Sequence, residues 1–244
     1  MKRILDMICS FFGLILLSPL LIPLMVLVWV HDFHSPFYVA LRVGKDGRIF
    51  KMVKLRSMVV NADQTGVDST SVDDSRITSV GRFIRKFKLD EFTQLWNVLK
   101  GDMSLVGPRP NVKRETDLYT DVEQGLLGVK PGITDFSSIV FSDENDILKD
   151  SEDPDIDYNQ LIRPWKSRLG LLYVKHQSFL LDCMLVLLTV VALFSREKAL
   201  WGVNRLLQIL DAPDYVIRVS KREDVLVPYP PPGADSVVTS RSAD

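Results

Sequence analysis

Cysteine and histidine are scarce in this 244-residue chain, which has two cysteines and three histidines. Cys9 and Cys183 both lie in apolar runs, and no Cys-x-x-Cys pair is present. A disulfide framework or a zinc site of the cysteine–histidine type is therefore not expected. The histidines form no His-Glu-x-x-His motif, so we interpret each as a buried or surface residue outside any metal site.

The chain also lacks an excess of charge of either sign, since its formal net charge is −1. Charge is nevertheless unevenly distributed. Residues 1–60 carry eight Lys or Arg against three Asp, whereas residues 143–157 carry eight Asp or Glu and one Lys. A basic region beside an apolar segment suits an anionic membrane surface or a phosphate-rich substrate. The acidic stretch is typical of a solvated loop, and no nucleic-acid partner is predicted.

Only one apolar run, Ile8 to Val30, has the length of about 20 residues that a bilayer span needs. It is too long for a signal peptide, and no Ala-x-Ala cleavage site follows it. Lys2 and Arg3 precede the run, and several Lys and Arg residues follow it after residue 41. The positive-inside rule places both basic groups on the cytoplasmic side.

Ser18-Pro19 lies near the middle of this run, and Pro23 follows about one turn later. Proline removes a backbone donor and clashes with the carbonyl four residues earlier, and a serine hydroxyl can bond a freed carbonyl. We therefore predict a re-entrant membrane helix over residues 1–35, a helix–break–helix with Ser18 and Pro19 at the break. A kinked helix that spans the bilayer is the alternative.

Residues 37–56 are expected to form a β-hairpin, because two apolar-rich runs flank a Lys-Asp-Gly turn. Residues 61–79 are polar and are predicted to form a loop. Helical spacing of apolar residues follows at 80–87 and at 92–99. The run 179–194 is apolar but short for a span, so a helix at the interface or packed on the domain is expected.

These elements predict an α+β protein that is mostly α. It would combine the N-terminal re-entrant helix, a small β-hairpin and a compact helical catalytic domain over residues 36–200, seated on one membrane leaflet. Residues 201–244 form a C-terminal extension with a cluster of four prolines followed by Ser, Asp and Thr. That composition favours polyproline II and partial disorder.

The residues best suited to chemistry lie between Arg82 and Pro110. Asp90-Glu91 precedes a helical run, where a carboxylate is ordinarily a cap. Adjacent carboxylates also suit phosphoryl transfer, since one can attack phosphorus and the other can hold a divalent ion. Four cations lie within eight residues upstream, and they suit either a solvated face or a pyrophosphate site: Arg82, Arg85, Lys86 and Lys88.

Two further cationic features have both a structural and a functional interpretation. Pro108-Arg109-Pro110 is a stiff loop, because proline restricts the backbone on both sides of the arginine. It is either a rigid surface turn or a loop that fixes a ligand phosphate or base. Lys54 and Arg56 lie at the end of the hairpin's second strand, where alternation puts both on one face, solvated or facing a ligand.

The run from Leu89 to Pro110, with its Asp-Glu and Pro-Arg-Pro motifs, resembles the signature of the bacterial sugar transferase family. These are the monotopic phosphoglycosyl transferases that start glycan assembly on polyprenyl phosphate. The resemblance covers roughly residues 1–200. Other segments fit the family in order: Lys2-Arg3 with Ser18-Pro19, Arg42-Val43-Gly44, Lys54-Leu55-Arg56-Ser57-Met58 and Val129-Lys130-Pro131-Gly132-Ile133-Thr134.

The resemblance implies a ping-pong reaction. Asp90 would attack the β-phosphate of a UDP-sugar, release UMP and pass the phosphosugar to polyprenyl (undecaprenyl) phosphate. Glu91 would hold the cofactor Mg²⁺. Arg85 and Arg109 would bind phosphate, and Pro108 and Pro110 would shape the nucleotide site.

Lys54 and Arg56 match a cationic motif of the family near its active site. The family also implies the bacterial inner membrane as the location, with the catalytic domain on the cytoplasmic face and membrane lipid as a further partner. A homodimer is compatible with the sequence. Two other functions remain open, a membrane-bound Mg²⁺-dependent phosphohydrolase with water as acceptor and a non-enzymatic membrane scaffold.

The chain departs from the family's pattern at two places within the motifs. Phe92-Thr93 stands where Leu-Pro usually follows the Asp-Glu pair, which changes the first turn of the helix. Asp135 stands where Gly usually follows Pro-Gly-Ile-Thr, and we interpret this added carboxylate as a candidate influence on substrate preference. The identity of the sugar depends on pocket shape and a few polar contacts.

Overall fold

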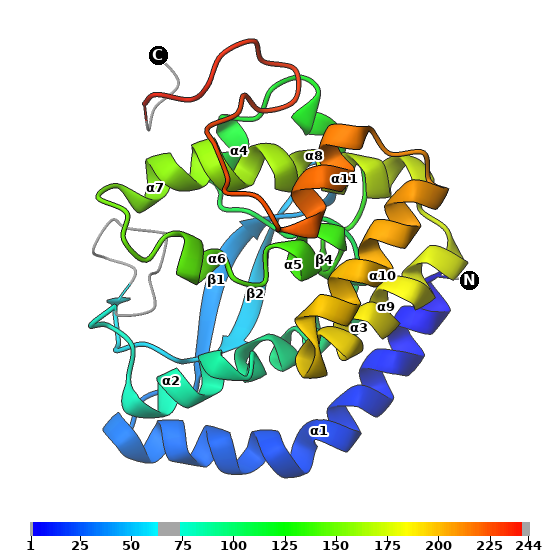
Figure 1. Cartoon of the computed structure of the whole chain (residues 1–244). Helices are drawn as coiled ribbons and strands as arrows, with labels where there is room; N and C mark the ends of the chain where they lie inside the picture. Colours follow the sequence, from blue (N-terminus) through cyan, green and yellow to red (C-terminus); the bar gives the residue numbers. More distant parts are fainter. Residues whose placement is uncertain (1, 63–73, 241–244) are drawn as a thin grey trace.

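The structure, a computed structural model, describes residues 2–62 and 74–240 and is mostly helical (Figure 1). Residues 63–73 of the predicted loop lie outside the described residues. The elements follow one another as α1 (Lys2–Asp32), β1 (Phe37–Val43), η1 (Lys45–Gly47), β2 (Ile49–Leu55), α2 (Ser79–Lys86), η3 (Leu89–Gln94), α3 (Leu95–Lys100), β3 (Ser104–Val106), α4 (Lys113–Asp117), η4 (Glu123–Gly128), β4 (Gly132–Thr134), α5 (Phe136–Val140), α6 (Glu144–Ile147), α7 (Pro154–Asp157), η5 (Tyr158–Ile162), α8 (Arg163–His176), α9 (Phe179–Phe194), α10 (Arg196–Ile209) and α11 (Asp214–Lys221).

The N-terminal apolar run forms one continuous helix, α1, which bends near its middle (Figure 1). Pro19 has no amide proton to donate to the carbonyl of Ile15, four residues earlier. The hydroxyl of Ser18 donates to that carbonyl instead, at 2.7 Å. The break expected at Ser18-Pro19 is therefore a bend rather than an interruption, because the side chain replaces the missing backbone hydrogen bond.

Both ends of α1 are bonded to the same globular body. At the first end, the Lys2 ammonium lies 2.7 Å from the Asp182 carboxylate on α9. At the last end, the Asp32 carboxylate accepts a hydrogen bond from the Arg56 guanidinium at 2.7 Å. The two ends therefore return to one body although the helix between them is 31 residues long.

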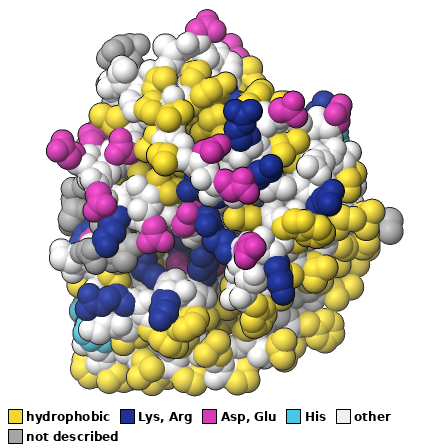
Figure 2. Space-filling view, in the orientation of Figure 1, with side chains coloured by type: hydrophobic (Ala, Val, Ile, Leu, Met, Phe, Trp, Pro, Cys, Tyr) yellow, Lys and Arg dark blue, Asp and Glu magenta, His cyan; other side chains and the backbone are white. Residues whose placement is uncertain are grey.

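The outward side of α1 is apolar, and Figure 2 shows apolar side chains gathered over this helix. Among the described residues, α1 is the helix whose length and composition suit a membrane crossing. The shorter apolar helix α9 buries Leu181, Asp182 and Leu185 against the body and exposes Leu180, Leu187 and Phe194. The two helices thus leave large apolar side chains uncovered.

The predicted hairpin is present, with β1 and β2 paired antiparallel from Phe37 opposite Leu55 to Val43 opposite Ile49. Its turn places Asp46 at φ 56° and Gly47 at φ 74°, in the left-handed region that Asn, Asp and Gly tolerate best. A second, shorter sheet pairs β3 with β4 in parallel. There a Cβ at Gly132 would lie 2.1 Å from the Gly107 nitrogen. The close approach of these two backbone segments therefore requires glycine.

The main core lies between α5, α8, α9, α10 and α11, and its largest fully buried side chains include Phe136 and Tyr173. Residues 201–221 belong to this core, because α10 and α11 contribute Val203, Leu207 and Val216 to it. The predicted boundary at residue 200 falls inside α10. The division into three domains stays a prediction.

The proline-rich segment beyond α11 runs along α8 and η5 rather than away from the body (Figure 1). The Tyr229 amide donates to the Gln160 carbonyl at 3.0 Å, and the Arg168 guanidinium donates to the Pro230 carbonyl at 3.0 Å. The Tyr229 ring lies 4.5 Å from the Trp165 ring, measured between centroids. These contacts attach the segment to the outer side of α8.

Candidate active site

Asp90 and Glu91 lie in η3, a short 3₁₀ segment between α2 and α3. Thr93 stabilises this turn, since its hydroxyl lies 3.0 Å from the Asp90 carbonyl and 3.2 Å from the Val53 carbonyl of β2. Phe92 packs against the buried cluster that joins α1 to η3. The Phe92-Thr93 departure thus has local roles: Thr93 connects the carboxylate turn to β2, and Phe92 connects it to α1.

Each of the two carboxylates forms an ion pair with a different cation. The Lys54 ammonium, near the end of β2, lies 3.8 Å from Asp90 Oδ2. The Arg109 guanidinium, from the Pro-Arg-Pro loop, forks onto Glu91, with Nη1 at 3.1 Å from Oε2 and Nη2 bonded to Oε1. The structure therefore brings together four predicted residues that are spread over more than 50 positions of the chain.

The two neighbouring carboxyls have different electrostatic surroundings. Burial raises the pKa of Asp90, against the lowering charge of Lys54. Burial also acts to raise the pKa of Glu91, but the charges of Arg109 and Lys54 outweigh it and lower that pKa to about 2. Glu91 is therefore a stable anion, suited to a cation, whereas Asp90 has the higher proton affinity and basicity of a nucleophile.

The four cations upstream of Asp90 separate into two groups. Arg82 and Lys86 are exposed on α2. Arg85 is half-buried; burial lowers its pKa, and the nearby Asp90 opposes that shift. Lys88 adopts φ 52°; partial burial of its ammonium lowers its pKa, and the charge of Glu91 opposes that shift. Figure 2 shows Lys and Arg side chains gathered with acidic ones around a hollow near the centre of this face.

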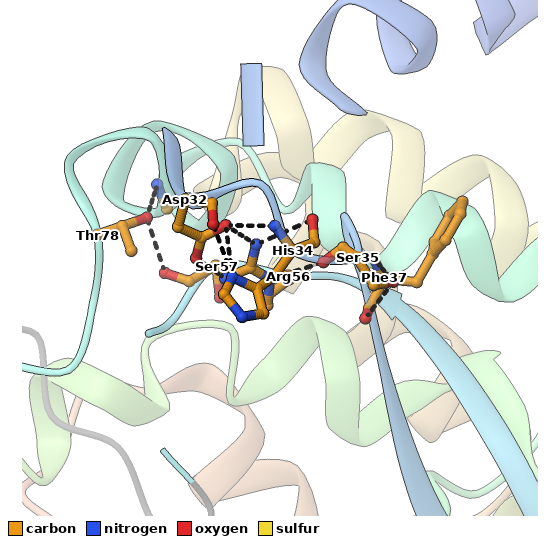
Figure 3. A network of polar contacts seen from close by, with 8 residues as sticks. Asp32, His34, Ser35, Phe37, Arg56, Ser57 and Thr78 are labelled. Carbon is orange, nitrogen blue, oxygen red and sulfur yellow. Dashed lines mark hydrogen bonds and ion pairs between the residues drawn. The ribbon is translucent and has the colours of Figure 1, made fainter. Parts of the chain in front are cut away.

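Arg56 lies outside this group, although it was predicted beside Lys54. It follows the last residue of β2 and points to the end of α1 (Figure 3). Its guanidinium is held by both oxygens of Asp32 and donates to the Ser35 carbonyl at 2.8 Å. Direct phosphate binding by Arg56 stays a prediction. The contacts of Arg56 indicate that it fixes the end of α1 relative to β2.

The Pro-Arg-Pro loop is fixed by its neighbours on both sides. Pro108 and Pro110 are buried, and the Pro108 carbonyl accepts the Gly132 amide at 3.0 Å. The loop lines a small cavity together with Val43, Gly44, Asn111, Tyr119, Leu126, Leu127, Val129 and Pro131. Segments from three of the motifs that resemble the family thus meet at one place beside Arg109.

Asp135 does not face this cavity as an added site carboxylate. It is 1% exposed, and its oxygens accept the hydroxyl protons of Ser137 and Ser138 and the Ser138 amide proton at 2.7 Å. Burial raises its pKa. Its structural role is to cap α5, which explains why a carboxylate is tolerated at this position.

No motif pointed to Glu144 and Lys166, whose charges act on Arg109 and Lys88. Lys166 on α8 forms an ion pair with Glu144 at the start of α6. The charge of Glu91, and to a smaller extent that of Glu144, acts to raise the pKa of Arg109. Burial is the main cause that lowers the pKa of Lys88, and the charge of Lys166 adds to it. The acidic segment 143–157 is therefore not merely solvated: three of its carboxylates, on Asp143, Glu144 and Asp155, are in ion pairs.

The carboxylates fit Mg²⁺ only in combination with a substrate. Within the described residues no group of three or more His, Cys, Asp and Glu is placed to hold a metal ion. Mg²⁺ is commonly bound by one or two carboxylates together with substrate phosphates and water. Glu91, whose pKa is lowered to about 2, is the ionised carboxylate that could serve such an ion beside a substrate phosphate.

The family model of the bacterial sugar transferases matches residues 1–196 of the chain. The chain belongs to this family. A bacterial sugar transferase of Salmonella typhimurium, named undecaprenyl-phosphate galactose phosphotransferase, is 42% identical over 166 residues, which are 62% of this chain and 34% of that protein. The UDP-glucose:undecaprenyl-phosphate glucose-1-phosphate transferase of Klebsiella pneumoniae is 36% identical over 81% of this chain and 41% of its own length.

The chain therefore spans 34% and 41% of the lengths of these two bacterial sugar transferases. It covers more of shorter relatives. The exopolysaccharide production protein ExoY of Sinorhizobium fredii is 37% identical over 161 residues, which are 60% of this chain and 70% of that protein.

Proposed function

We propose that this chain is an enzyme that transfers a sugar 1-phosphate from a UDP-sugar to polyprenyl (undecaprenyl) phosphate, as the first membrane step of glycan assembly. Membership of the bacterial sugar transferase family supports this, as do relatives named for transfer of galactose and glucose phosphate to undecaprenyl phosphate. The observation that carries the proposal is the Asp90-Glu91 pair held between Lys54 and Arg109.

The geometry suits a reaction in two displacements. An oxygen of Asp90 attacks the β-phosphorus of the donor, the bond between that phosphorus and the bridging oxygen breaks, and UMP leaves with the electron pair. An oxygen of the polyprenyl phosphate then attacks the same phosphorus and displaces the Asp90 carboxylate. Lys54 orients Asp90 and offsets negative charge in both steps, because its ammonium lies 3.8 Å from the nucleophile.

Arg85 and Arg109 approach the carboxylates from different elements, α2 and the Pro-Arg-Pro loop. We propose that both bind phosphate oxygens, since a guanidinium presents paired donors that match them. Glu91, the anion beside Arg109, would hold Mg²⁺. When bound, the ion supplies neutralisation of the pyrophosphate charge.

We also propose that α1 enters one leaflet and returns, which leaves the catalytic body on the cytoplasmic face of the inner membrane. The contacts at both helix ends support this, because Lys2 and Asp32 bond to the same body. The bend at Pro19 and the exposed apolar side chains of α1 fit such a path. Membrane lipid is then a third partner beside the two substrates, and a homodimer stays a prediction.

Straightening α1 tests this path. In the double variant Pro19→Ala, Pro23→Ala, the backbone hydrogen bonds are restored and the helix is expected to span the bilayer in a fraction of molecules. An N-terminal epitope in the unsubstituted chain is expected to react with antibody only in inverted vesicles. In the double variant part of it is expected to react in right-side-out vesicles. Opposite exposure of the two chain termini in the unsubstituted chain would overturn the re-entrant path.

The reaction is tested by UMP release from UDP-galactose, UDP-glucose and their N-acetyl forms, with and without undecaprenyl phosphate. We expect sustained release that requires the lipid and is abolished by EDTA and restored by Mg²⁺. Sugar phosphate formed without lipid would indicate a phosphohydrolase. No UMP from any donor with membrane-inserted protein would favour a scaffold and contradict the proposed function.

A further inference from the structure

A half-buried ion pair lies beside the proposed active site on elements that the family motifs do not include. Lys166 on α8 pairs with Glu144 on α6, and their side chains are 16% and 33% exposed. The Lys166 ammonium also lies 5.3 Å from the centre of the Tyr158 ring. We call Glu144, Lys166 and Tyr158 the α6–α8 cluster. It combines a carboxylate, an ammonium and an aromatic ring.

The cluster lies within electrostatic reach of the groups around the dyad. The charge of Glu144 contributes to the raised pKa of Arg109, the residue that pairs with Glu91. The charge of Lys166 contributes to the lowered pKa of Lys88, two positions before Asp90. Figure 2 shows acidic and basic side chains surrounding the hollow on this face. These charge interactions indicate that the cluster lies near Arg109 and Lys88, which suits contact with a donor bound at the dyad.

The Glu144–Lys166 pair is not needed to attach α6 to the body. The preceding residue, Asp143, already joins this segment to α10 and α11, with Arg196 at 2.8 Å and Arg222 at 3.2 Å. The hydroxyl of Tyr158 makes no hydrogen bond within residues 2–62 and 74–240, the part of the chain that the structure describes. The Glu144 carboxylate remains 33% exposed beside Lys166, so it keeps the capacity to accept hydrogen bonds from a ligand.

The chemistry of the cluster matches a sugar. A carboxylate accepts hydrogen bonds from neighbouring hydroxyls, an ammonium donates to ring substituents, and an aromatic ring packs against the apolar side of a pyranose. We propose that Glu144 and Lys166, together with Tyr158, bind the donor sugar and determine which UDP-sugar is used. This inference rests on the proposed transferase function and identifies the part of the site that selects the sugar.

The test compares kcat/KM for UDP-galactose, UDP-glucose and their N-acetyl forms in Glu144→Gln, Lys166→Met and Tyr158→Leu, the last of which removes the ring proposed to pack against the sugar. Loss of a hydrogen bond to a charged group is expected to lower kcat/KM for the preferred donor about 10- to 100-fold. For donors that lack the matching hydroxyl, kcat/KM is expected to change much less. The ratio of kcat/KM between the preferred donor and the others therefore falls by about tenfold. Inhibition by UMP, which has no sugar beyond its ribose, is expected to stay unchanged.

Lys166→Arg retains the donor group and is expected to recover part of the discrimination. The matched control is Asp143→Asn, which removes a carboxylate one position away without touching the cluster. It is expected to lower thermal stability and leave the ratio between donors unchanged. A fall of the same factor for every donor in the cluster variants would overturn the inference, since that result indicates general support of Arg109. Absence of turnover in the unsubstituted chain would instead refute the transferase function itself.

Discussion

Replacing Asp90 by Asn is expected to reduce lipid-dependent UMP release by a factor on the order of 10³ or more, the scale observed when an enzyme loses its nucleophile. Asn keeps the shape of the side chain but cannot form the phosphosugar ester. The protein is expected to fold normally, because burial already disfavours the charge of Asp90 and the variant removes that charge.

A single-turnover experiment separates chemistry from binding. Protein incubated with UDP-sugar and no lipid is expected to gain the mass of one phosphosugar in the unsubstituted chain and none in Asp90→Asn. Asp102→Asn is the matched control, because Asp102 is a nearby partly exposed carboxylate that pairs with Lys100 at 3.1 Å. An adduct on the Asp90→Asn protein would move the nucleophile to another residue, with Glu91 the first to examine.

The parts of the fold that the sequence predicts are those that local rules determine. The hairpin follows from the Asp-Gly turn between two apolar-rich runs, and its register is as expected for a short turn. The bend in α1 follows from Pro19, and the Ser18 hydroxyl bonds the carbonyl that proline leaves free. The two prolines alone do not predict that the helix continues, as it does, past both Pro19 and Pro23.

The carboxylate turn shows the same limit. Apolar spacing from Phe92 predicts a helix, and α3 does follow, but Asp90 and Glu91 lie in a 3₁₀ segment before it. The Thr93 hydroxyl lies within hydrogen-bond distance of the carbonyls of Asp90 and Val53, and the contact with Val53 crosses 40 positions of the chain. Only the tertiary position of β2 makes that bond available, so spacing alone predicts a regular helix where the turn is tighter.

The candidate site divides along the same line. Asp90, Glu91, Arg109 and Lys54 belong to motifs of the sequence, and the structure brings them together, with Lys54 beside Asp90 and Arg109 beside Glu91. Glu144 and Lys166 pair across 22 positions in segments with no motif. An acidic stretch looks solvated when its partners on other helices are unknown.

The proline-rich segment was predicted from composition to favour polyproline II and disorder. Its described part lies along α8, where Arg168 stands 4.8 Å from the Tyr229 ring and donates to the Pro230 carbonyl. The composition of a segment indicates whether it has enough apolar residues to form a core of its own. It does not reveal an aromatic and cationic surface elsewhere in the chain to which such a segment can bind.

The largest effect on stability is expected from Glu123, which forms a fully buried ion pair with Arg163. Their side chains are 0% and 3% exposed, and Arg163 Nη2 lies 2.6 Å from Glu123 Oε2. Glu123 also accepts the hydroxyl proton of Ser167 at 2.6 Å. Glu123→Ala leaves the Arg163 charge buried without a counter-charge, which costs about 3–5 kcal/mol. For a domain of this size that corresponds to a fall in Tm of about 6–20 °C.

Thermal unfolding in detergent measures this, with Lys113→Ala as the control. Lys113 pairs with Asp117 on the surface, where both side chains are more than half exposed, so its loss is expected to cost less than about 1 kcal/mol. The double variant Glu123→Met, Arg163→Met is expected to recover most of the loss, because neither charge then remains buried. Equal shifts for Glu123→Ala and Lys113→Ala would contradict the assignment.

The consequence for catalysis follows from position. Glu123 begins η4, whose Leu126 and Leu127 line the cavity beside the Pro-Arg-Pro loop. Weakening the pair is therefore expected to raise KM for the UDP-sugar before it lowers kcat, since the cavity wall is displaced while Asp90, Lys54 and η3 keep their contacts. A fall in kcat with unchanged KM would separate this ion pair from donor binding and leave it a purely structural role.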